Sequence, residues 1–467
     1  MKKREHWSST FGFILAASGS AVGLGSLWRF PYYTGENGGA LFVLFYLLFT
    51  FLIGLPIFIA ELVMGRSSQK SPVGAFSDLS GHQRGWKSVG YLCVFSSFLI
   101  LSFYSVVASW ALNYVLMSLC HWSKDLSADQ IRAAFDILYR SGDLNLFWHF
   151  VFISMNIAVV YGGVQQGIER WSRVLMQALF WILIALLVYC SRLDGFTEAF
   201  NFVLMPNFEK FGAMSILKAL GMAFFTLSLG LGIVLTYGSY MKSDESLPKT
   251  ALIICLVNVS VSILASLIIF PIIFTFSLPP QEGPGLVFKT MPILFERLNG
   301  GILLSSTFFL VLLLTAITSS ISLLEVLVAH FIELWSWSRK KTSVFVGLSA
   351  FVMGVPSALA GSKLLFPNWE LIYGKDFFHT VSDAPDLLMP LGGLFISVFV
   401  GYFMNKEEVK EQFFSGSRWH FLFYPWYFSI RYLAPLGIIL IMLHQADPDL
   451  LAAFFSFIEQ KFEVFKS

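Results

Sequence analysis

Charged residues are scarce in this sequence. Asp, Glu, Lys and Arg together make up 13% of its 467 residues, whereas an average soluble domain has about 25%. The formal net charge is only +2, which gives no support for a nucleic-acid partner. The scarcity of charge excludes an average soluble domain.

Cysteine and histidine are also sparse, and neither shows the spacing of a metal site or a disulfide framework. The four cysteines are scattered, and three of them fall within apolar runs, as expected for small core residues. The glycines at positions 19, 23 and 25 lack the spacing and the preceding strand of a dinucleotide-binding loop. No Ser-His-Asp arrangement can be assembled either, so the sequence predicts a protein that is not an enzyme.

Long apolar runs are what the sequence has in abundance. Hydrophobic residues make up 56% of the chain, and a helix of about 20 such residues crosses the ~30 Å hydrocarbon core of a bilayer. The pattern predicts an all-α polytopic membrane protein with about 11 transmembrane helices. The expected spans are residues 10–33, 39–64, 88–119, 147–163, 171–190, 215–239, 250–277, 302–335, 343–360, 388–404 and 424–443.

The loops between these spans indicate an orientation. Lys and Arg are more frequent in the loops on the side of the N-terminus, which predicts that the N-terminus is cytoplasmic. The outside segment 283–298 begins with Pro284 and Gly285 and continues with a helical pattern, so we expect a short helical cap there. The Phe-rich, charged tail, residues 447–467, is expected at the membrane interface.

Glycine interrupts two of the spans near their middle. Gly19, Gly23 and Gly25 fall within residues 11–31, and Gly230 and Gly232 fall within residues 224–232. Glycine costs about 1 kcal/mol in a helix interior, so three within seven positions indicate a broken helix. A broken helix in a membrane lines a polar cavity or is buried in protein, although this spacing is also typical of close helix packing.

The interrupted spans are the first and the sixth. Spans one to five and six to ten would then be two halves that each begin with a broken helix, and because five is odd they enter the membrane from opposite sides. The alternative is that Gly-Leu-Gly occurs twice by coincidence. The prediction is a single transmembrane domain with an inverted five-plus-five helix repeat. Repeat one covers about 8–191, repeat two about 213–405, and an extra helix with the tail about 420–467.

Hydroxyl groups accompany the breaks. Thr226 and Ser228 lie beside the second break, and residues 315–320 (TAITSS) form a polar patch in the otherwise aliphatic eighth span. The free carbonyls of an unwound helix together with adjacent hydroxyls suit Na⁺. An isolated pair of hydroxyls more often bonds back to its own helix, but four together opposite two broken helices favour an ion site.

Four other polar residues lie within or at the ends of the apolar runs. Asn258 is either an ion ligand or a contact that joins helices. Glu61 and Glu325 are intramembrane carboxylates, which are either functional or cap freed backbone groups. Arg29 either closes an outer gate with a carboxylate or extends to the membrane interface.

Several short motifs are spread over nearly the whole chain, in the order and at the spacing that one family of proteins has. They are Arg4-Glu5-His6-Trp7, residues 19–31, Glu36-Asn37-Gly38-Gly39, residues 224–232, Thr236-Tyr237-Gly238-Ser239-Tyr240 and Thr318-Ser319-Ser320. At these positions the sequence resembles the neurotransmitter:sodium symporter family, in its bacterial amino-acid transporter branch. The resemblance implies a protein of the bacterial inner membrane that couples the inward Na⁺ gradient to uptake of amino acids or related amines by alternating access.

Carried over position by position, the resemblance implies one or two sodium sites. One would consist of the carbonyls of Gly19, Val22 and Thr315 and the hydroxyls of Thr318 and Ser319. The other would consist of Ala21, Thr226 and Asn258 with the substrate carboxylate, and with Ser26 in place of the family's usual asparagine. The serine hydroxyl either substitutes for that amide or leaves the site weakened or lost.

A chloride site is a further implication of the resemblance. Ser262 stands where many bacterial members have an acidic residue that replaces chloride, and it is a member of a possible chloride site with Tyr46, Thr226 and Asn258. However, Met222 replaces the glutamine that normally completes that site. Dependence on chloride therefore stays an open hypothesis.

The substrate site implied by the resemblance is lined mainly by apolar groups. Its members are Ser20, Ala21, Leu24, Gly25, Ile100, Tyr104, Phe225, Thr226, Ser228, Leu231, Ser319 and Leu323. The N–H groups around Leu24 and Gly25 and the Tyr104 hydroxyl would meet the substrate carboxylate. Gly23 stands where monoamine carriers of the family have an aspartate, which favours a free amino acid with an apolar side chain.

Two gates are implied on either side of this pocket. Phe225 would be the lid on the outer side, with Arg29 above it and either Asp383 or Asp386 as the partner of Arg29. On the inner side, Arg4 and Trp7 would close against Glu333.

The expected function is a Na⁺-coupled secondary active symporter that imports a neutral, apolar amino acid. One alternative is the same fold with altered coupling, by a single Na⁺ or by H⁺, because Ser26 departs from the family pattern. The other alternative is a substrate sensor that no longer transports.

Overall fold

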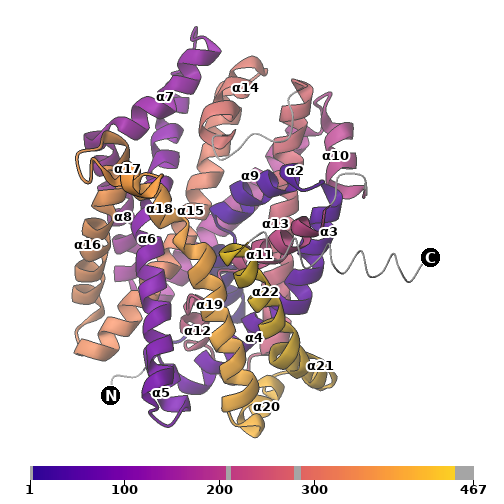
Figure 1. Ribbon diagram of the computed structural model, residues 1–467, viewed down its shortest axis with the longest axis vertical. Helices are drawn as coiled ribbons and strands as arrows, with labels where there is room; N and C mark the ends of the chain where they lie inside the picture. The colour runs from indigo at the N-terminus through magenta and orange to yellow at the C-terminus, as the bar shows by residue number, and fades with distance from the viewer. Residues whose placement is uncertain (1–3, 207–211, 278–285, 448–467) are drawn as a thin grey trace.

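The computed structural model describes residues 4–206, 212–277 and 286–447, and regular structure in these ranges is entirely helical (Figure 1). The helices that build the membrane-spanning part are α1 (Thr10–Ala21), α2 (Phe30–Glu36), α3 (Ala40–Phe49), α4 (Leu55–Ser68), α6 (Arg84–Leu119), α8 (Gly142–Tyr161), α9 (Arg170–Cys190), α11 (Ala213–Thr226), α12 (Ile233–Gly238), α13 (Leu247–Thr275), α15 (Gly301–Trp335), α16 (Arg339–Ala358), α19 (Ala384–Val398) and α22 (Ala434–Ala446). The remaining helices are α5 (Pro72–Leu79), α7 (Ala128–Arg140), α10 (Phe196–Leu204), α14 (Met291–Arg297), α17 (Trp369–Tyr373), α18 (Phe377–Ser382), α20 (Lys406–Phe414) and α21 (Phe423–Phe428).

The number of spans is close to the predicted eleven. Within the described ranges, nine helices are long and apolar enough to cross a membrane, and the bent pair Thr10–Ala21 and Gly25–Glu36 makes ten. The predicted span 215–239 is divided between α11 and α12, each of which is too short to cross alone. The protein is thus an all-α, multi-pass membrane protein. The inverted repeat and its boundaries stay a prediction.

The first predicted break is real. The helix axis turns by 54° between α1 and the π-helical turn Gly25–Arg29. At the turn, the N–H of Gly23 donates to the carbonyl of Ala21 over 3.0 Å, and the N–H of Ser26 donates to the carbonyl of Gly23 over 3.2 Å. These local bonds replace the regular helical ladder, so some backbone carbonyls of the turn are free for other partners.

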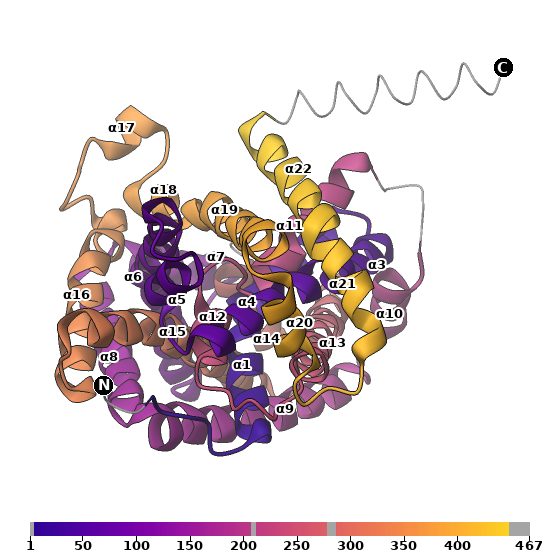
Figure 2. The same cartoon turned by 90° about the horizontal axis from the view of Figure 1, so that it is seen from below.

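The second break lies between α11 and α12, and it requires glycine. Ser228, Gly230 and Gly232 all have positive φ, at 53°, 81° and 72°. A Cβ atom on Gly230 would lie 2.2 Å from the carbonyl oxygen of Met389, so α19 approaches the unwound segment too closely for any side chain. Seen from below, α1 and α12 lie near the centre of the helix bundle (Figure 2).

Glu61 on α4 is fully buried and caps this second break. Its carboxylate accepts hydrogen bonds from the N–H of Gly230 over 2.8 Å and from the N–H of Leu235 over 3.3 Å. Of the two interpretations offered by the sequence, the geometry matches the capping role. A carboxylate is suited to this role because the freed N–H groups carry partial positive charge.

Two loop predictions have different outcomes. The described part of the predicted cap, residues 286–297, is helical, as a π-helical turn and α14. Residues 278–285 lie outside the described residues. The predicted interfacial tail also lies outside them from residue 448 onward.

Replacing Glu61 is expected to destabilise the fold. The change Glu61→Gln keeps the shape of the side chain but sets an amide N–H₂ against a backbone N–H, so we expect a loss of about 1–3 kcal/mol. Thermal unfolding of purified protein in detergent measures it. Glu407→Gln, at an exposed carboxylate, is the control, and an equal melting temperature for both variants would contradict the capping role.

Candidate functional site

Oxygen atoms surround the amide of Asn258 on α13. One terminal atom of the amide lies 2.8 Å from the Ser26 hydroxyl and 3.3 Å from each of the carbonyl oxygens of Ala21 and Thr226. The other terminal atom lies 3.1 Å from the Tyr46 hydroxyl and 3.2 Å from the Thr226 hydroxyl. The first and second helix breaks therefore meet at this one fully buried side chain.

The two possible orientations of this amide suit different partners. With the N–H₂ group toward Ala21 and Thr226, the amide donates to their carbonyls and its own oxygen accepts from Tyr46 and Thr226. With the amide oxygen on that side, three or more oxygen atoms face one another, which is favourable only around a cation. The donor set therefore fits Na⁺, and it includes Ala21, Ser26, Thr226 and Asn258 as the sequence predicts.

A second cluster joins α1 to α15. The Ser319 hydroxyl lies within hydrogen-bond distance of the carbonyls of Gly19, at 3.3 Å, and Ser20, at 3.2 Å. The Thr318 hydroxyl bonds to carbonyls of its own helix, one of them that of Thr315 at 3.0 Å. The structure thus brings Gly19, Thr315, Thr318 and Ser319 together, while their role and that of Val22 as ligands stay a prediction.

The members of the possible chloride site are also close together. The Tyr46 hydroxyl lies 3.0 Å from that of Thr226 and 3.3 Å from that of Ser262, and all three are buried. Ser262 also donates to the carbonyl of Asn258 over 3.0 Å. Met222 is buried too and lines a cavity near the gate at Arg29. Whether the hydroxyl cluster binds an anion stays open.

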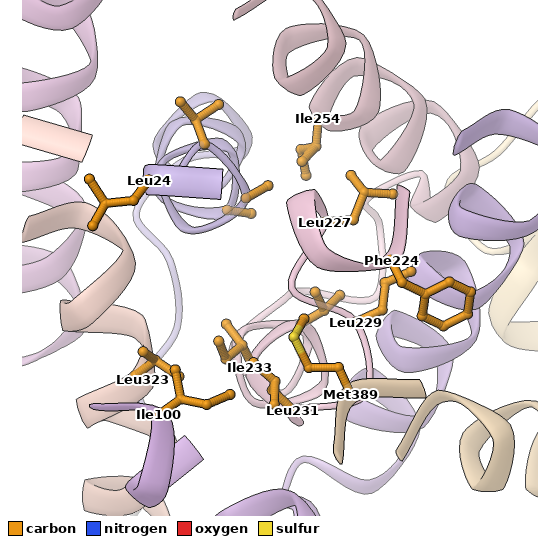
Figure 3. Close-up of a cluster of buried hydrophobic side chains, with 14 of the residues drawn as sticks. Leu24, Ile100, Phe224, Leu227, Leu229, Leu231, Ile233, Ile254, Leu323 and Met389 are labelled. Carbon is orange, nitrogen blue, oxygen red and sulfur yellow. The ribbon is translucent and has the colours of Figure 1, made fainter. Parts of the chain in front are cut away.

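The predicted substrate pocket is closed by apolar side chains. Leu24, Ile100, Leu231 and Leu323 are each at most 6% exposed and belong to one buried cluster (Figure 3). The N–H of Leu24 donates to the Tyr104 hydroxyl over 3.3 Å, so the two groups predicted to meet a carboxylate are adjacent.

Polar groups form one wall of this pocket. The Ser228 hydroxyl donates to the carbonyl of Ser20 over 3.3 Å. The Ser20 hydroxyl lies 2.7 Å from that of Ser322, a residue that sequence reasoning missed. The signal was present, because Ser322 lies three positions after Ser319 and shares its helix face.

The gate at Arg29 is shut. Arg29 pairs with Asp386 over 2.7 Å, and its guanidinium lies 4.3 Å from the centre of the Phe225 ring. A cavity of about 170 Å³ lies beside this gate, bounded also by α11, α19 and α22. Of the two candidates predicted as partner of Arg29, the structure thus has Asp386 in contact with it, whereas Asp383 pairs with Lys375 over 2.7 Å. Asp383 precedes the first turn of α19 and Asp386 lies within it, which directs the two side chains to different partners.

The opposite gate is shut as well. Arg4 forms an ion pair with Glu333, and Glu333 also accepts from the N–H and the hydroxyl of Ser71. Trp7 is buried and donates to the carbonyl of Tyr237 over 3.0 Å rather than to Glu333. The charged residues predicted for the two gates are therefore paired on both sides, while their role as gates stays a prediction.

Glu325 lies near Arg4, because both contact Tyr240. Its fully buried carboxylate accepts from the Tyr240 hydroxyl over 2.5 Å and from Arg339 over 2.7 and 2.9 Å. Arg339 also pairs with Glu5 over 3.0 Å. The sequence singled out Glu325 but not Arg339, which looked like one member of a basic loop.

Two broken helices with clusters of oxygen atoms at their breaks, inside a bundle of membrane-spanning helices, are typical of a membrane transporter. The family model of the sodium:neurotransmitter symporter family matches residues 4–127 and 128–443. The chain belongs to this family. It is therefore a multi-pass, Na⁺-using transporter of a small-molecule substrate and not an enzyme.

Individual relatives agree with this assignment. The chain is 38% identical to the uncharacterized sodium-dependent transporter YhdH of Bacillus subtilis, over 95% of this chain and 98% of that protein. It is 32% identical to an uncharacterized sodium-dependent transporter of Haemophilus influenzae, over 95% and 98% of the two chains. The crystal structure of MhsT in complex with L-phenylalanine superposes with a TM-score of 0.84, at 38% identity, over 94% of this chain and 99% of that one.

Breaking the ion pair at Arg29 is expected to open that gate more often. A partly exposed pair contributes up to about 1 kcal/mol, so Asp386→Asn should raise the open population about fivefold. With Cys120 replaced by serine, the rate at which a water-soluble thiol reagent labels Ile100→Cys measures the opening. Asp383→Asn is the matched control, and an equal rise for both variants would contradict the assignment.

Proposed function

We propose that this protein is a secondary active symporter that imports a neutral, apolar amino acid together with Na⁺. It would do so in a bacterial plasma membrane, with its N-terminus in the cytoplasm. The observation that carries the proposal is the amide of Asn258, which stands among oxygen atoms of both broken helices. Such an arrangement ties a cation to the two segments that an alternating-access transporter must move.

The proposal includes two sodium ions for each transport cycle. The first would bind at Ala21, Thr226 and Asn258 with Ser26, next to the substrate carboxylate. The second would bind between α1 and α15, at the carbonyls of Gly19, Val22 and Thr315 and the hydroxyls of Thr318 and Ser319. The contact of Ser319 with two carbonyls of α1 supports this second site.

An apolar amino acid is the substrate class that the lining supports. Leu24, Ile100, Leu231 and Leu323 provide apolar contacts, while Tyr104 and the N–H groups at the first break suit a carboxylate. Gly23 provides no carboxylate for an amine, and because a Cβ atom there would lie 2.8 Å from the Ser319 hydroxyl, an aspartate would require the Ser319 side chain to move. The similarity to MhsT, which was crystallised with L-phenylalanine, supports the same class.

Uptake into proteoliposomes tests the proposal directly. We expect labelled apolar amino acids to accumulate with an inward Na⁺ gradient and not when choline replaces Na⁺. In a third experiment, gluconate replaces chloride. It decides whether uptake requires chloride, which the hydroxyl cluster at Tyr46 would bind. Equal uptake in choline would favour coupling to H⁺, and substrate binding without uptake would favour a sensor.

Ser26 is expected to set the affinity for one sodium ion. Removing its hydroxyl with Ser26→Ala takes away one oxygen 2.8 Å from the Asn258 amide, so the half-saturating Na⁺ concentration should rise about fivefold, or roughly 1 kcal/mol. Sodium titrations of uptake measure this change. Ser266→Ala, at a buried serine that bonds only back along α13, is the control, and an unchanged titration for Ser26→Ala would exclude Ser26 from the site.

A further inference from the structure

The segment 364–373, between α16 and α18, exposes large apolar side chains outside the spanning helices. Leu371 is 85% exposed, the highest value for any large apolar residue in the described part of the chain, and Leu364 and Ile372 are 71% and 70% exposed. None of the residues of α17 is buried. A contiguous apolar surface of this kind marks an interaction site rather than a solvated loop.

Contacts among its own aromatic side chains hold the segment in this exposed conformation. The rings of Phe366, Trp369, Tyr373 and Phe377 pack on one another with centroid distances of 4.5–5.6 Å. The indole N–H of Trp369 donates to the Thr380 hydroxyl over 3.0 Å, so its polar group is turned inward. A helix in water buries its apolar side chains and exposes its polar groups, whereas here leucine and isoleucine point outward.

The apolar surface continues that of α16. Val344, Phe345, Leu348, Val352 and Met353 are exposed along α16, as expected for a helix that faces lipid. Leu364 follows six residues after α16 ends, and both views place α17 at the periphery of the bundle, beside that end of α16 (Figures 1 and 2). The two apolar surfaces are therefore neighbours at the periphery of the helix bundle.

The helix α7 on the same face of the protein provides a contrast. It buries Ile131 and Leu138, and it exposes the polar Asp129 and Gln130. The exposed side of α7 is therefore mostly polar, with Ile137 as its one strongly exposed large apolar residue, at 65%. In the segment 364–373, by contrast, several large apolar side chains are exposed together.

We propose that the segment 364–373 is a membrane anchor that inserts Leu364, Leu371 and Ile372 into the boundary between lipid headgroups and acyl chains. Tyr373 and Trp369 suit this depth, because aromatic residues with one polar atom favour the membrane interface. The Lys363–Glu370 and Lys375–Asp383 pairs, whose side chains are more than half exposed, remain at the headgroup level. The partner is the lipid surface around the protein.

A fluorescent label on the segment tests this proposal. Cys120 is the exposed cysteine among the four and is replaced by serine, while Cys93, Cys190 and Cys255 are buried. Leu371→Cys is then labelled with an environment-sensitive nitrobenzoxadiazole dye. The full-length protein is reconstituted in vesicles of equal parts phosphatidylethanolamine and phosphatidylglycerol. Asp129→Cys on α7 is the matched control for water, and Val352→Cys on α16 is the control for the acyl region.

We expect the label at position 371 to emit at shorter wavelength than the label at 129. It should resist aqueous iodide and be quenched more strongly by lipids with a nitroxide near the headgroup than by lipids with a deep nitroxide. Iodide quenching equal to that at position 129 would overturn the proposal. Protection from both iodide and lipid nitroxides that disappears at one transporter per vesicle would assign the surface to a second copy instead, which also overturns it.

Discussion

The structure depends on satisfying backbone groups that two broken helices leave free inside a membrane. Hydrocarbon offers no hydrogen bonds, so each freed N–H or carbonyl group needs a partner from the protein or an ion. Glu61 supplies acceptors for the break between α11 and α12. At the break after α1, the carbonyl of Ala21 instead faces the Asn258 amide. The N–H groups of the second break are thus capped by a carboxylate, whereas the Ala21 carbonyl of the first break faces a neutral amide.

The site thus consists of one segment that is fixed by buried contacts and of two ends that are held by ion pairs. The segment from Gly230 to Leu235 is fixed by a buried carboxylate and by the close approach of α19. On either side of this segment, a partly exposed ion pair joins parts of the chain that are distant in sequence. These pairs are Arg29 with Asp386 and Arg4 with Glu333. Such pairs are weak and easily exchanged with water. The centre of the helix bundle is therefore held more firmly than the two ion pairs on either side of it.

Much of this arrangement could be predicted from the sequence, because glycine and isolated polar residues are conspicuous in apolar helices. The breaks, the helical class and the approximate number of spans were predictable on that basis. The resemblance of the motifs located the residues that meet at Asn258. The acidic partner of Arg29 was not decided, because Asp383 and Asp386 differ only in their place at the start of α19. Ser322 was missed because its partner Ser20 lies on a helix far away in the sequence. Arg339 was missed because it looked like one member of a basic loop, although its partner Glu325 is only 14 residues away.

The amide of Asn258 lies between two sets of oxygen atoms with different chemistry. On one side are the carbonyl oxygens of Ala21 and Thr226, and on the other is the hydroxyl of Tyr46. A primary amide has one oxygen face and one nitrogen face, and it cannot present the same face to both sides. A group that binds at the first set of oxygen atoms thereby determines whether the amide offers its oxygen or its N–H₂ to the second set. One rotatable bond thus couples the two sides of the side chain.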